Sequence, residues 1–240
     1  MNLYEMKKNM VNSYGEKKDE DQAELINYYF VRPISFWVAS VFAVYKIRAN
    51  TITWLSLAFG LIGVLLFFKG GHVSQIISSL LIFIWLILDC VDGNLARYYK
   101  TQSIFGDFLD SLVCYIVFAF LPISIAYSIN NASLSSEVLF LLGWMYSIGF
   151  TLSRLIYQKF KQISNKKYKN FLSGGENASV KQKAFSFVNN IFNPSGFMVP
   201  FLVISAVFEW LEVYLIIYGV GYFFILIYSV SIFIYKARTI

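Results

Sequence analysis

An apolar run is missing from the beginning of this 240-residue sequence, because its first 25 residues are mostly polar and charged. No N-terminal signal peptide is therefore indicated, and we expect the first membrane span to act as the insertion signal. Cysteine is scarce as well, and the two cysteines, Cys90 and Cys114, both fall inside apolar stretches. These positions argue against a structural disulfide and do not indicate the redox compartment.

Charged residues make up only 14% of the chain, whereas hydrophobic residues make up 58% and the mean hydropathy is +0.59. A soluble core of this size needs less apolar side chain, so the excess has to face lipid. A helix needs about 20 mostly apolar residues to cross a hydrocarbon layer ~30 Å thick. We therefore predict an all-α bundle of six transmembrane helices. The apolar stretches are residues 52–69, 73–96, 104–129, 136–157, 195–211 and 213–235.

The basic residues are distributed unevenly between the predicted loops. If the N-terminus is cytoplasmic, every Lys and Arg except Lys69 lies on the cytoplasmic side. Since cytoplasmic loops retain such residues, we expect a multi-pass protein of the cell membrane with both termini in the cytoplasm. The net charge of +6 then reflects orientation and contact with anionic lipid or substrate, and we expect no nucleic-acid partner. The lysine-rich connection 159–194 either anchors this face or helps to hold an anionic substrate.

Three regions are expected along the chain. Residues 1–22 are charged and lack apolar periodicity, which predicts a flexible cytoplasmic tail. Residues 23–49 interleave aromatic and aliphatic side chains with basic ones, which predicts an amphipathic juxtamembrane helix at the membrane interface. Residues 50–240 would form the six-helix transmembrane catalytic domain, with Asn50 capping the start of its first helix.

All aspartates after Asp21 lie within residues 89–110, at the expected cytoplasmic ends of two membrane helices. Each carboxylate placed there costs a few kcal/mol, so the cluster needs a compensating partner. Residues three or four apart share a helical face, which places Asp89 and Asp92 together on the first helix. The link to the second helix is short, so the two helices should be antiparallel neighbours. We therefore expect Asp110 of the second helix to face Asp89 and Asp92.

Carboxylates that face one another repel and take up protons unless a cation lies between them. Oxygen ligands of this kind suit Mg²⁺, Mn²⁺ or Ca²⁺. Gly93 and Ala96 leave a wall without side chains where a phosphate could approach, and Arg97 offers a fork for phosphate oxygens. The sequence thus predicts a metal-bound pyrophosphate site. The candidate metal ligands are Asp89, Asp92, Asp107 and Asp110.

The order and spacing of these residues resemble the signature of the CDP-alcohol phosphotransferase family. That signature has two acidic residues three apart, then Gly, Ala-Arg, a spacer of eight or nine residues, Gly, and two aspartates at four-residue steps. The resemblance extends to the layout, because that family has an interfacial helix, six spans and a cytoplasmic active site. Seven positions match: Asp89, Asp92, Gly93, Ala96, Arg97, Gly106 and Asp110.

The resemblance implies transfer of a substituted phosphate from a CDP-linked donor to an alcohol acceptor, with release of CMP. The pathway would be phospholipid or related polar-lipid and glycan synthesis. The resemblance also implies a homodimer and a pair of Mg²⁺ or Mn²⁺ ions held by Asp89, Asp92 and Asp110. Gly93 and Ala96 would border the cytidine, and Arg97 would lie near the donor phosphates. The candidate substrate-binding residues are Gly93, Ala96, Arg97, Gly106 and Arg154.

The chain departs from the signature at its last aspartate, taken as the base that deprotonates the acceptor hydroxyl, which aligns with Cys114. An unperturbed thiol has a pKa of about 8.5, against about 3.9 for Asp, and it is a poor Mg²⁺ ligand. Four explanations stay open: Asp107 is the base, a Cys114 thiolate is the base, the acceptor needs no base, or the protein binds nucleotide without catalysis. The candidate catalytic residues are Asp110, Asp107 and Cys114.

For three other residues, a purely structural role is weighed against a role in function. Arg154, near the inner end of the fourth predicted span, either snorkels to lipid headgroups or binds an anionic acceptor. Ser111 is expected to turn about 100° away from Asp110, so we expect no serine nucleophile. His72 is expected to be a solvated residue of an outer loop. An ion-coupled transporter would place carboxylates near the bilayer centre, whereas here they lie at one helix end.

Overall fold

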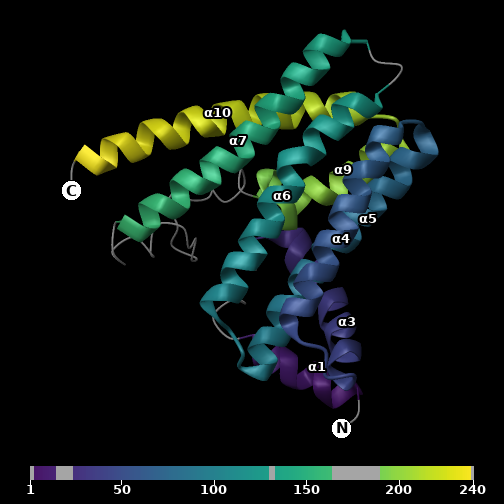
Figure 1. The fold of residues 1–240 in the computed structure, drawn as a ribbon, viewed down its shortest axis with the longest axis vertical. Helices are drawn as coiled ribbons and strands as arrows, with labels where there is room; N and C mark the ends of the chain where they lie inside the picture. Colours follow the sequence, from purple (N-terminus) through teal and green to yellow (C-terminus); the bar gives the residue numbers. More distant parts are fainter. Residues whose placement is uncertain (1–2, 15–23, 130–132, 164–189, 239–240) are drawn as a thin grey trace.

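The computed structural model describes residues 3–14, 24–129, 133–163 and 190–238, and these residues form helices and turns with no strand (Figure 1). Five helices are long and apolar enough to cross a membrane, with mean hydropathy between 1.4 and 2.1. The prediction of an all-α membrane bundle is therefore confirmed. These helices are α4 (Ala49–Lys69), α5 (His72–Tyr99), α6 (Ile104–Ser128), α7 (Ser136–Ile163) and α10 (Leu211–Arg238).

The remaining predicted span, residues 195–211, is present as a short and broken apolar segment. A π-helical turn, η3 (Pro194–Met198), contains a non-helical residue, Gly196 with ψ −124°, and leads into α9 (Val199–Val207). Proline has no backbone N–H to donate, which contributes to the break at Pro194. At a rise of ~1.5 Å per residue, η3 and α9 together extend about 21 Å, less than a hydrocarbon layer of ~30 Å.

Helices α4, α5 and α6 pack closely because glycines lie where they approach one another. A Cβ atom on Gly60 of α4 would lie 2.6 Å from Cγ2 of Val117 in α6. One on Gly63 would lie 3.1 Å from the carbonyl oxygen of Ser78 in α5. Small residues permit such close helix contacts in membranes. Because the link of residues 100–103 is short, the end of α5 and the start of α6 lie side by side.

Helices α7 and α10 pack along each other and diverge from the α4–α6 bundle toward their C-terminal ends (Figure 1). Buried tyrosines join them: the ring of Tyr146 stacks on Tyr222 with centroids 5.1 Å apart, and its hydroxyl lies 3.1 Å from that of Tyr214. A Cβ atom on Gly149 would lie 2.6 Å from the Tyr222 carbonyl oxygen. This packing brings Arg154 of α7 beside the start of α6.

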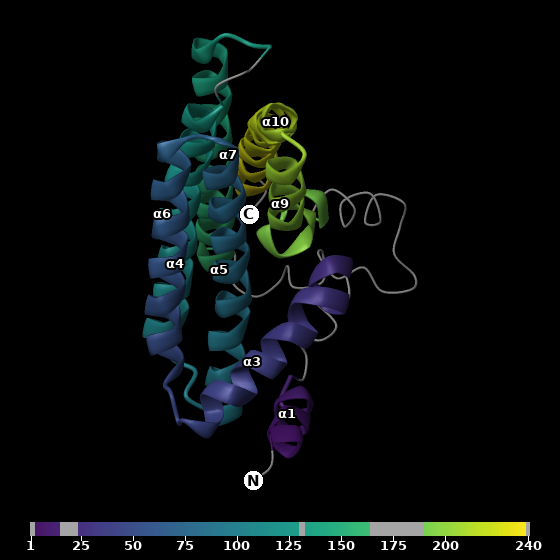
Figure 2. The same cartoon turned by 90° about the vertical axis from the view of Figure 1, so that its right-hand side faces the viewer.

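The N-terminal region packs against the end of α5 (Figure 2). Within the segment expected to be a flexible tail, residues Leu3–Asn12 form a helix, α1. The tail prediction missed this helix because its apolar residues are few, yet Met10 is 1% exposed and packs into a small core with α3 and α5. The turn η1 (Asn27–Val31) and helix α3 (Arg32–Val44) follow.

Helix α3 carries apolar side chains on its buried face and on its exposed face. Phe36 and Ala39 are buried, whereas Trp37 and Val41 are exposed. An exposed apolar face suits contact with lipid, which supports the predicted juxtamembrane helix. Its position at the membrane interface stays a prediction.

Two expectations about helix starts are corrected. Arg48, and not Asn50, occupies the N-cap of α4 with no side-chain cap bond, and the Asn50 side chain instead faces Gly106 of α6. His72 is exposed, as expected for a solvated residue, but it is the first residue of α5 and not a loop residue, and its Nε2 lies 3.1 Å from the carbonyl oxygens of Ala206 and Val207. It therefore ties the start of α5 to the end of α9.

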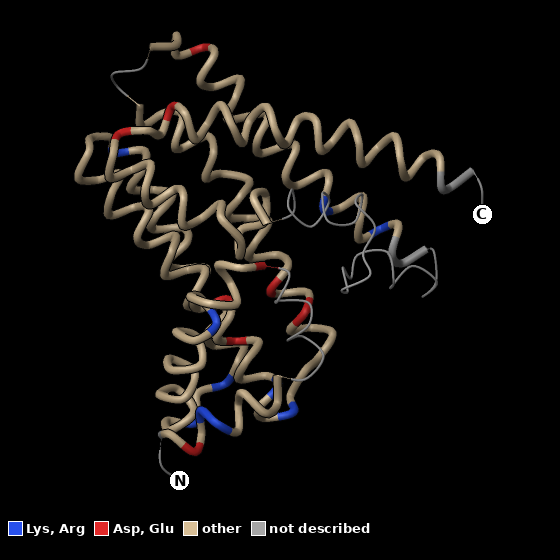
Figure 3. The backbone as a smooth tube through the Cα atoms, turned by 180° about the vertical axis from the view of Figure 1, so that it is seen from behind, with Lys and Arg blue, Asp and Glu red and all other residues tan. Residues whose placement is uncertain are grey.

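The charged residues of the described chain are segregated. Figure 3 shows most Lys and Arg near the N-terminal end of the bundle and along the last part of α7, and Asp and Glu mainly in the middle and at the opposite end; the exceptions include Lys69 at the end of α4 and Glu5 in α1. This distribution agrees with the orientation predicted from the loops, which stays a prediction. Residues 164–189 of the lysine-rich connection lie outside the described residues.

Candidate active site

The end of α5 and the start of α6 border a cavity of ≈ 280 Å³, called the larger cavity below. The Glu24 carboxylate lines it together with three aspartates: Asp89 and Asp92 from the second half of α5, and Asp110 from the second turn of α6. The sequence placed the three aspartates on facing helices, and the structure brings them to one space. Three arginines line the same cavity, namely Arg32, Arg97 and Arg154.

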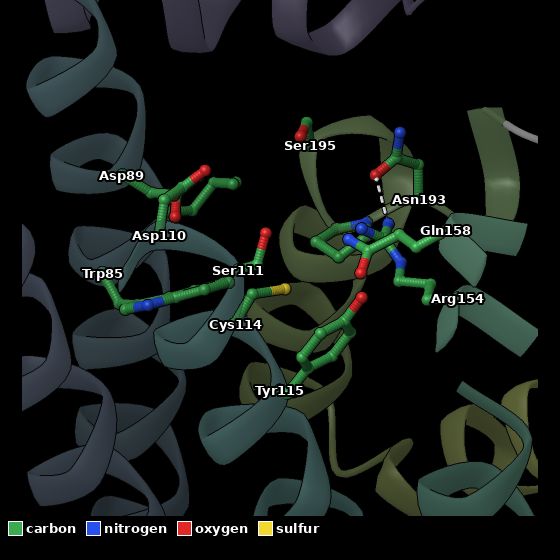
Figure 4. Close-up of a pocket in the computed structure, with 12 residues that line it drawn as sticks. Trp85, Asp89, Asp110, Ser111, Cys114, Tyr115, Arg154, Gln158, Asn193 and Ser195 are labelled. Atoms are coloured by element: carbon green, nitrogen blue, oxygen red, sulfur yellow. Dashed lines mark hydrogen bonds between the residues drawn. The ribbon is translucent and has the colours of Figure 1, made fainter. Parts of the chain in front are cut away.

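A smaller cavity of ≈ 110 Å³ adjoins the larger one, and Asp89 and Asp110 line both. Figure 4 shows these two carboxylates on one side of the smaller cavity and Arg154 on the other. Its other lining residues are largely neutral. They include Ser111, Cys114 and Tyr115 from α6, Gln158 from α7, and Asn193 and Ser195 from the segment around η3.

Asp92 is the most buried of the three aspartates, with 6% of its surface exposed, and its Oδ2 atom has no hydrogen-bond partner. A buried carboxylate oxygen without a donor is costly, by roughly 1–3 kcal/mol or more for a charged group. Because Asp92 lines the same cavity as Asp89 and Asp110, a cation there would satisfy this oxygen. The residues present therefore fit a divalent metal ion.

The three aspartates around the larger cavity do not form a complete set of metal ligands. Among the residues that the structure describes, no three His, Cys, Asp or Glu side chains converge closely enough to hold an ion between them. Mg²⁺ usually keeps several waters and takes further oxygens from substrate phosphates. An open arrangement of three aspartates around a cavity is compatible with that mode of binding.

The wall formed by Gly93 differs from the expected bare surface. A Cβ atom on Gly93 would lie 3.3 Å from Nη1 of Arg97, because the arginine side chain folds back over the glycine along the helix. Glycine thus makes room for the guanidinium of Arg97 at the cavity, and both residues line it. The two predicted substrate-binding residues act here as one unit.

The structure places three other predicted site residues away from both cavities. Ala96 is partly buried in the small core with α3. Gly106 donates its N–H to Oγ of Ser103, the N-cap of α6, at 3.1 Å. Asp107 is exposed in the first turn of α6 and lines neither cavity. No observation supports a direct role in the site for these three residues, and such a role stays a prediction.

Cys114 lies where the motif spacing placed it, one helical turn beyond Asp110, and it lines the smaller cavity. Cys90 is buried and donates to Oδ1 of Asn27 at 3.9 Å, whereas Cys114 is partly buried. Ser111 was expected to turn away from Asp110, yet both line the smaller cavity, because this space reaches around the α6 helix surface. Ser111 therefore brings a hydroxyl to the smaller cavity.

The opposite wall comes from residues that the motif did not indicate. Arg154 donates to Oδ1 of Asn193 at 3.1 Å, and the Asn193 amide donates in turn to the Glu24 carboxylate. The amide of Asn27 also donates to Glu24, at 3.1 Å. Arg154 was predicted as a substrate-binding residue, whereas Asn193 and Glu24 were not; the Asn-Pro-Ser-Gly run at 193–196, polar residues at the start of an apolar stretch, could have indicated Asn193.

Comparisons with known proteins agree with this geometry. The inner membrane protein YnbA of Escherichia coli (strain K12) is 31% identical over 118 residues, which are 46% of this chain and 54% of that protein. The chain thus spans about half the length of this curated relative. The model of the CDP-alcohol phosphatidyltransferase family matches residues 46–225, a segment that contains the whole acidic motif, α4 to α9 and half of α10. The chain belongs to the CDP-alcohol phosphatidyltransferase family.

Proposed function

We propose that this protein is a divalent-metal-dependent membrane transferase that moves a substituted phosphate from a CDP-linked donor to an alcohol acceptor and releases CMP. The reaction would serve phospholipid or related polar-lipid and glycan synthesis. One observation carries the proposal: Asp89, Asp92 and Asp110 line a single cavity together with three arginines. A diphosphate donor needs this combination of metal-binding carboxylates and phosphate-binding cations.

Asp89, Asp92 and Asp110 would hold Mg²⁺ or Mn²⁺, with the unpartnered Oδ2 of Asp92 as one ligand atom. A pair of such ions, typically ~4 Å apart, stabilises the negative charge on the attacking and leaving oxygens of a phosphoryl transfer. Asp107 was predicted as a further ligand, but its exposed position on α6 does not support that role.

The two cavities suggest where each substrate binds. The donor diphosphate would lie in the larger cavity, with Arg97 on its oxygens and Gly93 beside the nucleotide. The acceptor hydroxyl would enter through the smaller cavity toward Asp89 and Asp110, which line both spaces. Its oxygen forms a bond to the donor's β-phosphorus, the bond from that phosphorus to the CMP oxygen breaks, and the hydroxyl proton passes to a base.

The identity of that base separates the main proposal from its alternative. Cys114 lies at the smaller cavity, where the family signature has an aspartate. A catalytically impaired relative that binds a CDP-alcohol without transferring it is therefore a second candidate function. The retained carboxylates favour the enzyme, because binding alone does not need three acidic residues around one cavity.

We further propose that both termini and the active site face the cytoplasm and that the protein forms a homodimer in the membrane. The charge distribution of Figure 3 supports the orientation, since Lys and Arg favour cytoplasmic ends. The exposed apolar face of α10, with Phe224 and Tyr228 more than half exposed, suits contact with lipid or with a second copy.

The test is CMP release by the purified full-length protein in detergent, with Mg²⁺, Mn²⁺ or EDTA, across a panel of CDP-linked donors and alcohol acceptors. We expect CMP to appear with at least one pair, only with metal and only with acceptor present. Binding of a CDP-alcohol without CMP release from any pair would support the impaired relative. Neither binding nor release with the whole panel would contradict both functions.

A further inference from the structure

Two arginines from distant parts of the chain converge at the larger cavity. Nη1 of Arg32, at the start of α3, donates to Oδ1 of Asn94 at 3.4 Å, and Nη2 of Arg97 donates to the same oxygen at 2.7 Å. Because both bonds end on one atom, the two nitrogens are at most about 6 Å apart. Both arginines line the larger cavity, and Arg32 is only 5% exposed.

The shared acceptor is itself held in place. The Asn94 amide nitrogen donates to Oγ of Ser35 at 3.0 Å, and Ser35 donates to the carbonyl oxygen of Arg32 at 2.9 Å. Asn94 and Ser35 are both almost fully buried. With its nitrogen committed to Ser35, the amide presents its oxygen to the two guanidinium groups. The arginine pair therefore has a rigid support that joins α3 to α5.

An aromatic ring from the N-terminal segment packs on the same pair. The guanidinium of Arg32 lies 5.2 Å from the ring centroid of Tyr14, and that of Arg97 lies 5.8 Å from it. Both distances are within the range of cation–π attraction. Tyr14 is 5% exposed and packs edge-on against Phe36 of α3 at 5.3 Å. One ring thus holds two cations that repel each other.

We propose that Tyr14 and Arg32, which lie outside the acidic motif and outside the family match, complete the donor site: Arg32 and Arg97 form a paired-guanidinium subsite for a diphosphate, and Tyr14 is its positioning residue. This inference rests on the proposed function and deepens it. Arg32 and Arg97 would each direct N–H groups at phosphate oxygens, and Tyr14 would hold their planes from the side away from the ligand.

The ligand class follows from the charges and the space. Two guanidinium groups that each bring a nitrogen to the same oxygen, and so have nitrogens at most about 6 Å apart, favour a ligand with two neighbouring anionic centres. A diphosphate has such centres, whereas a nucleoside monophosphate has one. Like charges at this separation repel, and a bound diphosphate lowers that repulsion, which strengthens binding. The cavity of ≈ 280 Å³ also contains the carboxylates that would bind the metal beside the diphosphate.

The first experiment compares binding of CDP and of CMP, with Mg²⁺ present, to the full-length protein in detergent by titration calorimetry. We expect Arg32→Gln to raise the dissociation constant of CDP about 10-fold or more, as for loss of a charged hydrogen-bond partner, and that of CMP far less. Arg32→Lys keeps the positive charge but loses the forked pair of N–H donors, so its dissociation constant for CDP should lie between those of the wild type and Arg32→Gln. An equal effect on both ligands, or none on CDP, would overturn the subsite.

The second experiment tests Tyr14 as a positioning residue by separating KM from kcat. Tyr14→Leu should raise the donor KM several-fold with little change in kcat, whereas Tyr14→Phe keeps the ring and should restore the wild-type value. Tyr4→Leu is the matched control, because Tyr4 lies on α1 and is 74% exposed. If Tyr14→Phe were as impaired as Tyr14→Leu, the ring would not be what positions the arginines.

Two further measurements distinguish lipid binding from donor binding, and failure of the subsite from failure of the proposed function. Anionic lipid headgroups share phosphate chemistry with the donor, so thermal stabilisation by phosphatidylglycerol is measured beside that by CDP. A loss of lipid stabilisation in Arg32→Gln with unchanged CDP affinity would contradict the proposal and assign the pair to lipid. Failure of the wild type to release CMP would defeat the proposed function, while the CDP and CMP titrations would still decide the subsite.

Discussion

The two cavities differ in charge although they share Asp89 and Asp110. The larger is lined by four carboxylates, Glu24 among them, and three arginines, whereas the smaller is lined by only those two aspartates and Arg154 among hydroxyl, amide, thiol and apolar groups. A space lined by many charges suits a metal-bound diphosphate, and a space lined by neutral polar groups suits a hydroxyl compound. The difference indicates a donor side and an acceptor side that meet at the shared carboxylates.

The supporting elements differ in the same way. The three aspartates Asp89, Asp92 and Asp110 stand on α5 and α6, which pack with α4 through close glycine contacts. Arg154 reaches the smaller cavity from α7 and is held through Asn193 by Glu24, from segments before α3 and before α9. The three aspartates therefore rest on one local bundle, whereas the wall around Arg154, which borders both cavities, depends on three separate parts of the chain.

The largest effect is expected where the cavities meet. Asp110→Asn or Asp89→Asn removes a charge from both cavities and should lower kcat for CMP release at least about 100-fold, a loss typical for one preorganised charge-stabilising group. The measurement is the initial rate of CMP release at saturating donor and Mg²⁺, with thermal melting to check folding.

The matched control for these variants is Glu137→Gln, an exposed acidic residue in the first turn of α7. It should leave the rate within about twofold, since surface substitutions of this kind rarely perturb a structure. Full activity in either aspartate variant would contradict the metal assignment and remove the distinction between the two sides.

A smaller effect is expected at Arg154. Among the described residues, its side chain is the basic group that lines the smaller cavity. Arg154→Gln should raise the acceptor KM about 10-fold or more if the acceptor is anionic, in line with a charged hydrogen bond, and change the donor KM less. The measurement is a pair of substrate titrations with each partner saturating.

Lys159→Gln provides the control for that variant, because Lys159 is an exposed cation on the same helix. It should change neither KM. A larger effect of Arg154→Gln on the donor than on the acceptor would assign Arg154 to the donor side, since it also lines the larger cavity.

The metal side was predictable from the sequence because its geometry is local. The 3.6-residue period placed Asp89 and Asp92 on one face of a helix, and the short link to α6 brought Asp110 opposite. Asp107 shows the limit of this reasoning: helical spacing gives an angle around the helix and not the packing outside it. That packing leaves Asp107 exposed.

The acceptor side was not predictable because its contacts join residues that are far apart in the sequence. Asn193 and Glu24 are 169 residues apart in sequence, and Asn193 lies at the N-cap of η3, just before the apolar stretch. Tyr14 lies in a segment whose composition resembles a disordered tail, and only its packing on two arginines indicates a role. Contacts between polar residues so far apart leave no periodic signal in a single sequence.

The smallest effect is expected at Cys114, which lines the acceptor side. Cys114→Ala should keep about a tenth or more of the wild-type rate, because loss of a general base costs roughly 100-fold or more and a thiol is poorly suited to that role. Cys114→Asp restores the family signature and should raise the rate if the native reaction proceeds without an efficient base. Both are measured as kcat for CMP release at fixed pH, beside thermal melting. A loss of 100-fold or more in the alanine variant, with folding intact, would identify the thiol as the base and make the acceptor side catalytic as well as binding.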